Sequence, residues 1–179
     1  KDVSGVSESA VEMNSGLQFY DGITSTEIQG ILIKSAADLI CLETPNYQYV
    51  AARLLLFQVR KSVFNTKWKD SKIYPALKDI VTRNINYNVY DDKLITYYSD
   101  EEWDKLDSYM KHDRDMMFTY AGLRQVVDKY LVQDRSSGLL YESPQYMYML
   151  IAAVLFKEYP KDKRLSYVKR YYDAVSSFK

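Results

Sequence analysis

Apolar residues recur at helical spacing along almost the whole chain. Ile28, Leu32, Ala36 and Leu39 are one example, because residues three or four apart lie on the same side of an α-helix. The same spacing predicts helices over 25–42, 45–64, 71–86, 99–111, 119–130, from Pro144 to Pro160, and over 162–178.

Local signals mark where several of these helices begin. Thr24 and Glu27 have the spacing of a capping box, in which each side chain bonds the other residue's backbone amide, and Ser99 and Glu102 repeat that spacing. Pro45 suits the first turn of the following helix, where its missing N–H costs no hydrogen bond. We therefore expect the helices to be separated by short loops.

The segment YLVQDRSSGLLYE has a different pattern. Two short apolar runs flank a turn that ends at Gly138, which is typical of a β-hairpin. The predicted fold class is mainly α, a helical bundle architecture with one short β-hairpin near 131–142. The polar segment NTKWKDSK, residues 65–72, is the best boundary candidate and predicts two domains, 1–64 and 65–179.

Composition excludes several functional classes. The 24 basic residues balance the 24 acidic ones, so no overall field attracts nucleic acid or a membrane. The longest apolar run, 146–156, has 11 residues, whereas a bilayer needs about 20. The single cysteine, Cys41, and the single histidine, His112, exclude an internal disulfide or a cysteine/histidine zinc site and favour a cytoplasmic protein.

The sequence offers few candidates for catalytic residues. Cys41 with His112 is the only available cysteine/histidine pairing, and we expect Cys41 to be a small buried thiol on the last turn of an apolar helix. Around His112, the segment KHDRDMMF combines opposite charges, which indicates a solvated or inter-helix salt-bridge cluster. We predict no catalytic residue and no metal ligand in this chain.

Nucleotide binding is better supported. Ser25 and Gln29 are four residues apart near a helix N-terminus, where free amides and the helix dipole favour an anion. A short loop makes the next helix run antiparallel, and this brings Lys61, or Lys61 together with Arg60, toward them. Basic residues at a helix C-terminus are also favourable without any ligand, so a solvated basic end is the alternative.

Five ordered blocks carry a family resemblance: FYDGITSTEIQGILIKSAADLI, PNYQYVAARLLLFQVRK, HDRDMMFTYAGLRQVVDKYLV, YESPQYMYM and LSYVKRYYDAVSSFK. They resemble the N-terminal part of the large (alpha) subunit of class I ribonucleotide reductase. The resemblance implies that residues 1–64 are an incomplete ATP cone, lacking the family's lysine-arginine-aspartate-glycine hairpin. It also implies that residues 65–179 are the helical domain that precedes the catalytic barrel.

The resemblance further implies an allosteric site for ATP or dATP at Ser25, Gln29 and Lys61, with Gln29 standing where histidine or aspartate is common. The family reduces ribonucleoside diphosphates with cysteines that lie in the barrel and the C-terminal tail, so this chain alone is predicted to be inactive. The implied partners are the rest of the alpha subunit, a second alpha subunit and the radical-generating beta subunit. The alternative is a helical module that docks on the rest of the reductase without binding nucleotide.

Overall fold

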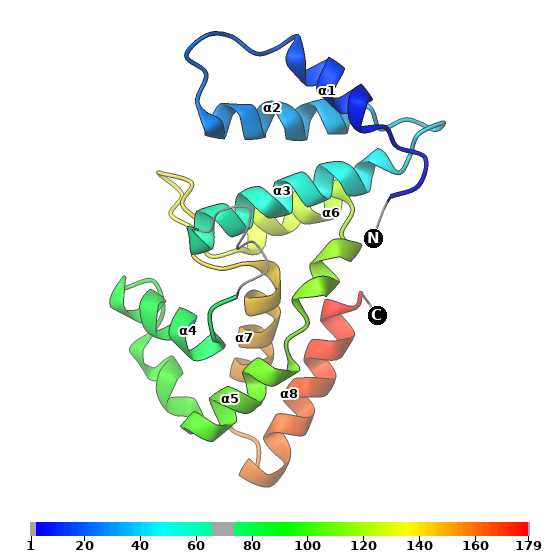
Figure 1. Cartoon of the computed structure of the whole chain (residues 1–179). Coiled ribbons are helices and arrows are strands. Elements are labelled where there is room, and N and C mark those ends of the chain that lie inside the picture. The colour runs from blue at the N-terminus through cyan, green and yellow to red at the C-terminus, as the bar shows by residue number, and fades with distance from the viewer. Residues whose placement is uncertain (1–2, 66–73, 179) are drawn as a thin grey trace. The chain divides into compact units, whose positions relative to one another are not determined.

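Helices dominate the computed structural model of the chain, which describes residues 3–65 and 74–178. The α-helices are α1 (Glu8–Gly16), α2 (Ser25–Asp38), α3 (Tyr47–Phe64), α4 (Leu77–Asn86), α5 (Asp100–Tyr109), α6 (Tyr120–Gln125), α7 (Pro144–Phe156) and α8 (Lys161–Ser176) (Figure 1). Shorter turns of other helical types are the 3₁₀-helices η2 (Asp92–Tyr97) and η3 (His112–Met117) and the π-helix η4 (Val126–Tyr130). The predicted mainly helical class is confirmed.

The predicted capping residues begin their helices. Thr24 accepts a hydrogen bond from the Glu27 amide while the Glu27 carboxylate accepts one from the Thr24 amide, and Ser99 and Glu102 form the same reciprocal pair at α5. Pro144 occupies the first turn of α7. These contacts involve residues three apart, so the sequence alone could specify them.

The chain divides into two compact units. The first unit comprises Lys1–Val59 and Met116–Tyr130, and the second comprises Arg60–Asp115 and Leu131–Lys179. The division falls within α3, whose last five residues belong to the second unit. The expected boundary segment 65–72 lies, apart from Asn65, outside the described residues, and the division into 1–64 and 65–179 stays a prediction.

The first unit has a small core between α1, α2 and α3. Its buried members are Val11, Ala36, Tyr47 and Ala51. α2 and α3 run in opposite directions, as the short loop between them predicts (Figure 1). The hydroxyl of Tyr47 accepts a hydrogen bond from the Ser7 amide at 2.9 Å and donates to the Ser7 carbonyl, so it fixes the chain that enters α1.

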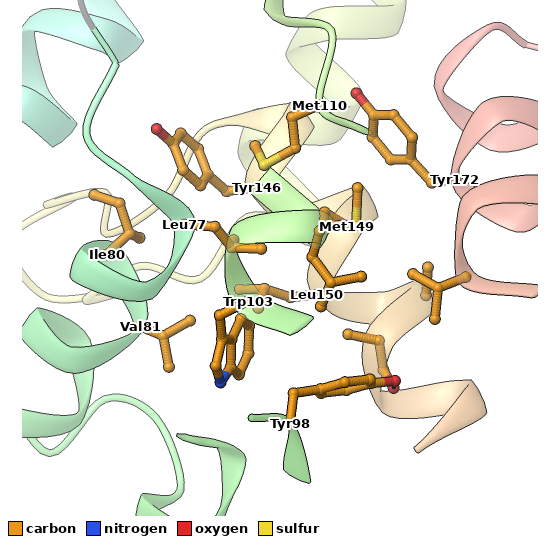
Figure 2. Packing of buried hydrophobic residues seen from close by; sticks show 14 of the residues in the cluster. Leu77, Ile80, Val81, Tyr98, Trp103, Met110, Tyr146, Met149, Leu150 and Tyr172 are labelled. Atoms are coloured by element: carbon orange, nitrogen blue, oxygen red, sulfur yellow. Dashed lines mark hydrogen bonds between the residues drawn. The ribbon is translucent and has the colours of Figure 1, made fainter. Parts of the chain in front are cut away.

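The second unit has the larger core, formed by α4, α5, α7 and α8. Figure 2 shows Leu77, Trp103, Met149 and Leu150 gathered between these helices. The central helix is α7, which is buried around most of its circumference, as expected of a helix that is almost entirely apolar. Among the described residues, no helix is both long and apolar enough to cross a membrane.

The predicted β-hairpin at 131–142 is wrong. Within the described parts of the chain no strand forms, and the segment contains one isolated antiparallel bridge, between Gln133 and Leu140. A turn that ends at Gly138 does reverse the chain, and its positive φ of 73° is one that glycine adopts without strain.

Side chains form hydrogen bonds with the backbone groups that would otherwise extend the strand pairing. The Val132 amide donates to the Glu142 carboxylate at 3.1 Å, and the Tyr141 carbonyl accepts from the side chains of Arg83 and Asn84. Strand pairing stops after one bridge because these side chains bond the backbone groups that would pair next. The sequence pattern could not reveal them.

Breaking the ion pair between α8 and α5 should destabilise the protein. Arg164 is 6% exposed and donates from Nε to the Glu102 carboxylate at 2.8 Å, so Glu102→Gln leaves a buried charge without its counter-ion. We expect a loss of about 3 kcal/mol in the free energy of unfolding, measured by urea denaturation. The matched control Glu101→Gln changes an exposed neighbour and should stay within about 0.5 kcal/mol. Equal losses in both variants would contradict this role for Glu102.

Candidate functional site

Ser25 is the first residue of α2 and is exposed. The same end of the helix carries the Glu27 carboxylate, which accepts hydrogen bonds from the Thr24 amide, the Thr24 hydroxyl and the Tyr20 hydroxyl. These three donors lower the pKa of Glu27, led by the Thr24 hydroxyl. An anion at this helix end would meet a carboxylate, so its charge must be neutralised from elsewhere.

Gln29 reaches from α2 to α3. Its side-chain amide donates a hydrogen bond to the carbonyl of Leu54 at 2.9 Å. Both residues belong to the first unit. The contact places the Gln29 face of α2 against the middle of α3, which is the antiparallel neighbour expected from the sequence.

Lys61 is exposed on the last turn of α3, seven residues after Leu54. Seven residues are close to two helical turns, so the two side chains leave α3 on nearly the same side, about 10 Å apart along its axis. Lys61 belongs to the second unit, whereas Ser25 and Gln29 belong to the first.

Arg60 does not share the exposure of Lys61, which corrects the expectation that both could face a phosphate. Arg60 is 5% exposed, its Nη2 lies 3.5 Å from Asp115 Oδ2, and its guanidinium lies 5.1 Å from the centre of the Tyr74 ring. Neighbouring residues on a helix point about 100° apart, so one basic residue is buried while the next is exposed.

A half-open cavity of about 380 Å³ lies within the first unit. It is lined by Val6, Ser7, Glu8, Val11, Glu12, Leu32, Tyr47, Val50 and Leu54. Its walls are mostly apolar, and its two charged residues are acidic, which does not suit a phosphate. The cavity does not contain Ser25, Gln29 or Lys61.

A buried polar network occupies the second unit. Asp115 is fully buried, and its Oδ1 accepts a hydrogen bond from the Gln145 amide at 2.8 Å. Gln145 in turn accepts from the Tyr172 hydroxyl at 2.6 Å, which connects η3, α7 and α8. Burial raises the pKa of Asp115 to about 6, although the hydrogen bond from Gln145 and the charge of Arg60 oppose the rise.

The predicted salt-bridge cluster at 111–118 is therefore only partly solvated. Arg114 does form an inter-helix ion pair, with Asp173 of α8 at 2.8 Å. Asp115 is instead a core residue, and its neighbours Gln145 and Tyr172 were not predicted from the sequence. One signal was present, since Gln145 is an uncharged polar residue next to a long apolar run, where it must find a buried partner.

His112 stacks on Tyr74, with the ring centres 3.7 Å apart and the ring planes 4° from parallel. Burial, together with the positive charge of Arg60, lowers the pKa of His112 to about 4. His112 is therefore neutral at pH 7. Its surroundings are those of a packed aromatic ring.

Cys41 is exposed, which corrects the expected buried thiol. α2 ends at Asp38, earlier than predicted, and Cys41 lies in the loop that follows. Its sulfur is 3.0 Å from the Thr44 hydroxyl. In the described parts of the chain, no group of three or more histidine, cysteine or acidic side chains could hold a metal ion.

Comparison with known proteins places these features in a family. Residues 116–179 match the ribonucleotide reductase all-alpha domain. The alpha subunit of ribonucleoside-diphosphate reductase 1 from Salmonella typhimurium is 48% identical over 177 residues, which are 99% of this chain and 23% of that protein. Alpha subunits from Haemophilus influenzae and Enterobacteria phage T4 are 46% and 43% identical, over 99% and 97% of this chain and 23% and 22% of their own lengths.

The chain belongs to the ribonucleotide reductase alpha-subunit family and corresponds to an N-terminal region of that subunit. The resemblance stated from the five sequence blocks is confirmed. The chain spans less than a quarter of the length of these relatives.

Replacing His112 by phenylalanine should change how stability depends on pH. Because its folded pKa is about 4, below the usual 6.5, the unfolded chain takes up a proton first, and stability is lost as pH falls through this window. Phenylalanine can keep the stacking on Tyr74 but cannot titrate. Relative to the wild type, the variant should gain about 2 to 3 kcal/mol in the free energy of unfolding between pH 7 and pH 4.5.

Urea denaturation of both proteins at the two pH values measures this difference. Asp115 has a raised pKa, so it contributes in the opposite direction in the same window, and it cancels because both proteins contain it. Parallel pH dependences would show that His112 does not carry the effect.

Proposed function

We propose that the chain is a regulatory and structural part of a ribonucleoside-diphosphate reductase alpha subunit. The full subunit would reduce ribonucleoside diphosphates to deoxyribonucleoside diphosphates in the cytoplasm, together with a second alpha subunit and a beta subunit. This proposal is supported by the alpha subunits compared above, which are 43–48% identical to the chain over 97–99% of its length. The catalytic cysteines are expected in the rest of the subunit, so this chain alone is inactive.

The regulatory role is the binding of ATP or dATP at Ser25, Gln29 and Lys61. The observation that carries this proposal is the hydrogen bond from Gln29 to the Leu54 carbonyl. It holds one candidate nucleotide-binding residue directly against α3, the helix that carries Lys61. Ser25 adds a hydroxyl one turn before Gln29. Lys61 supplies a positive charge for the nucleotide phosphates. This charge is needed because the Glu27 carboxylate at the start of α2 would repel them.

Lys61→Ala should remove the stabilisation of the chain by ATP. A ligand at 100 times its dissociation constant adds about 2.7 kcal/mol to the stability of a protein that binds it only when folded. We expect ATP to raise the melting temperature of the wild-type chain and to leave that of Lys61→Ala unchanged. The matched control Lys34→Ala, on the exposed surface of α2, should keep the shift.

The outcome separates three possibilities. A shift that survives in Lys61→Ala would show that ATP binds elsewhere on the chain. Repeating the titration with dATP tests whether the site distinguishes the two sugars. No shift with either nucleotide would contradict nucleotide binding by this chain and would favour the second candidate function.

The second candidate is a helical module that docks on the rest of the alpha subunit without binding nucleotide. Ile151, Val154 and Leu155 favour it, because they are 43%, 42% and 54% exposed and lie on one side of α7. Their neighbours on α7 are core residues, so this side is the apolar surface that the unit does not cover itself. A docking role predicts that serine at Leu155 weakens association with the remainder of the subunit and leaves the melting temperature nearly unchanged.

A further inference from the structure

The last turn of α3 is fixed by the second unit through a buried arginine. Arg60 Nη2 pairs with Asp115 Oδ2 at 3.5 Å and lies at the same distance from the His112 carbonyl, to which it donates. The guanidinium also lies over the Tyr74 ring. All of these partners belong to the second unit, as does Arg60.

Two further contacts hold the same turn. The Val63 carbonyl is one of the last four of α3 and has no partner within the helix, and it accepts a hydrogen bond from Arg83 Nη1 at 2.8 Å. The Phe64 ring packs against Tyr146, with the ring centres 5.6 Å apart. Contacts of this kind restrict both rotation and sliding of the helix end.

Fixing Arg60 also fixes the direction of Lys61. An α-helix is locally rigid, and neighbouring side chains point about 100° apart around its axis. Arg60 is buried and Lys61 is exposed, in agreement with this rotation. A turn of α3 that exposed Arg60 would swing Lys61 by the same angle, so the Arg60 contacts determine from which side of α3 the Lys61 side chain projects.

We propose that Arg60 is a positioning residue for Lys61, and that Asp115 holds it in place. Asp115 is itself held by Gln145 of α7, which is bonded to Tyr172 of α8, so the direction of Lys61 is set by the packing of the second unit. The positioning of Lys61 by Arg60 does not depend on the proposed nucleotide site. Its effect on nucleotide affinity does rest on that proposed function. If Lys61 binds phosphate, the second unit controls the affinity.

Protonation of Asp115 should weaken this control. Below a pH of about 6 the carboxyl becomes neutral and Arg60 loses its counter-charge. The titratable and charged groups near Asp115 include Arg60 of α3, His112 and Asp113 of η3, the tyrosines 74, 146 and 148, and Tyr172 of α8. Arg60 is the cation that pairs directly with the Asp115 carboxylate, so this ion pair carries the pH dependence.

The test compares Asp115→Asn with the matched control Asp113→Asn in the full chain. Asparagine at 115 keeps the shape and the hydrogen bond to Gln145 but removes the charge, whereas Asp113 is an exposed neighbour on η3. Hydrogen–deuterium exchange should show about tenfold lower protection at residues 60–64 in Asp115→Asn at pH 7.5. Asp113→Asn should match the wild type.

Nucleotide affinity provides the second readout. At pH 7.5 ATP should bind Asp115→Asn about tenfold more weakly than wild type, and the ratio of the two dissociation constants should approach one at pH 5.5. The protonation of ATP itself cancels in this ratio. A purely structural role for Asp115 would give parallel pH curves.

Unchanged protection at 60–64 in Asp115→Asn would overturn the proposal. If Asp115→Asn loses protection throughout the chain, the proposal is tested by hydrogen–deuterium exchange of the wild type at two pH values. Its protection factors at 60–64 should then fall between pH 7.5 and pH 5.5, while those of α2 stay constant. Absence of any Lys61-dependent ATP binding would contradict the proposed nucleotide site. The exchange measurement would still show whether Asp115 fixes the turn that carries Lys61.

Discussion

Burial of the Asp115 carboxylate is the constraint on which the second unit depends. A charged group taken out of water is strongly unfavourable unless it is paired and hydrogen-bonded. Arg60 supplies the charge and Gln145 supplies the hydrogen bond, and they come from helices that are far apart in the sequence. α3, η3 and α7 must therefore assemble together, because a partial assembly would leave a buried charge without its partner.

Tyrosines extend this constraint through the core. Tyr172, Tyr98 and Tyr146 bury their rings and use their hydroxyls as donors, to Gln145, the Ala153 carbonyl and the Pro75 carbonyl respectively. Each residue thus combines a large apolar surface with one directional bond. These three hydroxyls connect helices to one another and to the loop before α4.

The position of α3 connects structure with the proposed regulation. Its first residues pack in the small core with α1 and α2, and its last turn carries a buried arginine beside an exposed lysine. In the proposed nucleotide site, α3 would contribute Lys61, whose direction the packing of the second unit would set. The proposed regulation would then depend on two neighbouring side chains of opposite burial, Arg60 and Lys61.

The sequence by itself determined the features that depend on nearby residues. The capping boxes at Thr24 and Ser99, the proline at the start of α7 and the helical periodicity involve contacts within one or two turns, so their spacing is visible in the sequence. The family resemblance was also visible, because it rests on ordered blocks of residues. The antiparallel arrangement of α2 and α3 followed from the short loop that joins them, whereas the hydrogen bond from Gln29 to the Leu54 carbonyl is a finding of the structure.

Only the tertiary structure decided the features that depend on distant partners. Asp115 is buried because Arg60 and Gln145 reach it, and strand pairing near 133–140 stops because Arg83, Asn84 and Glu142 take the neighbouring backbone groups. Cys41 is exposed because α2 ends before it. Local spacing carries no information about long-range desolvation and long-range hydrogen bonds, and these decided which charged residues became part of the core.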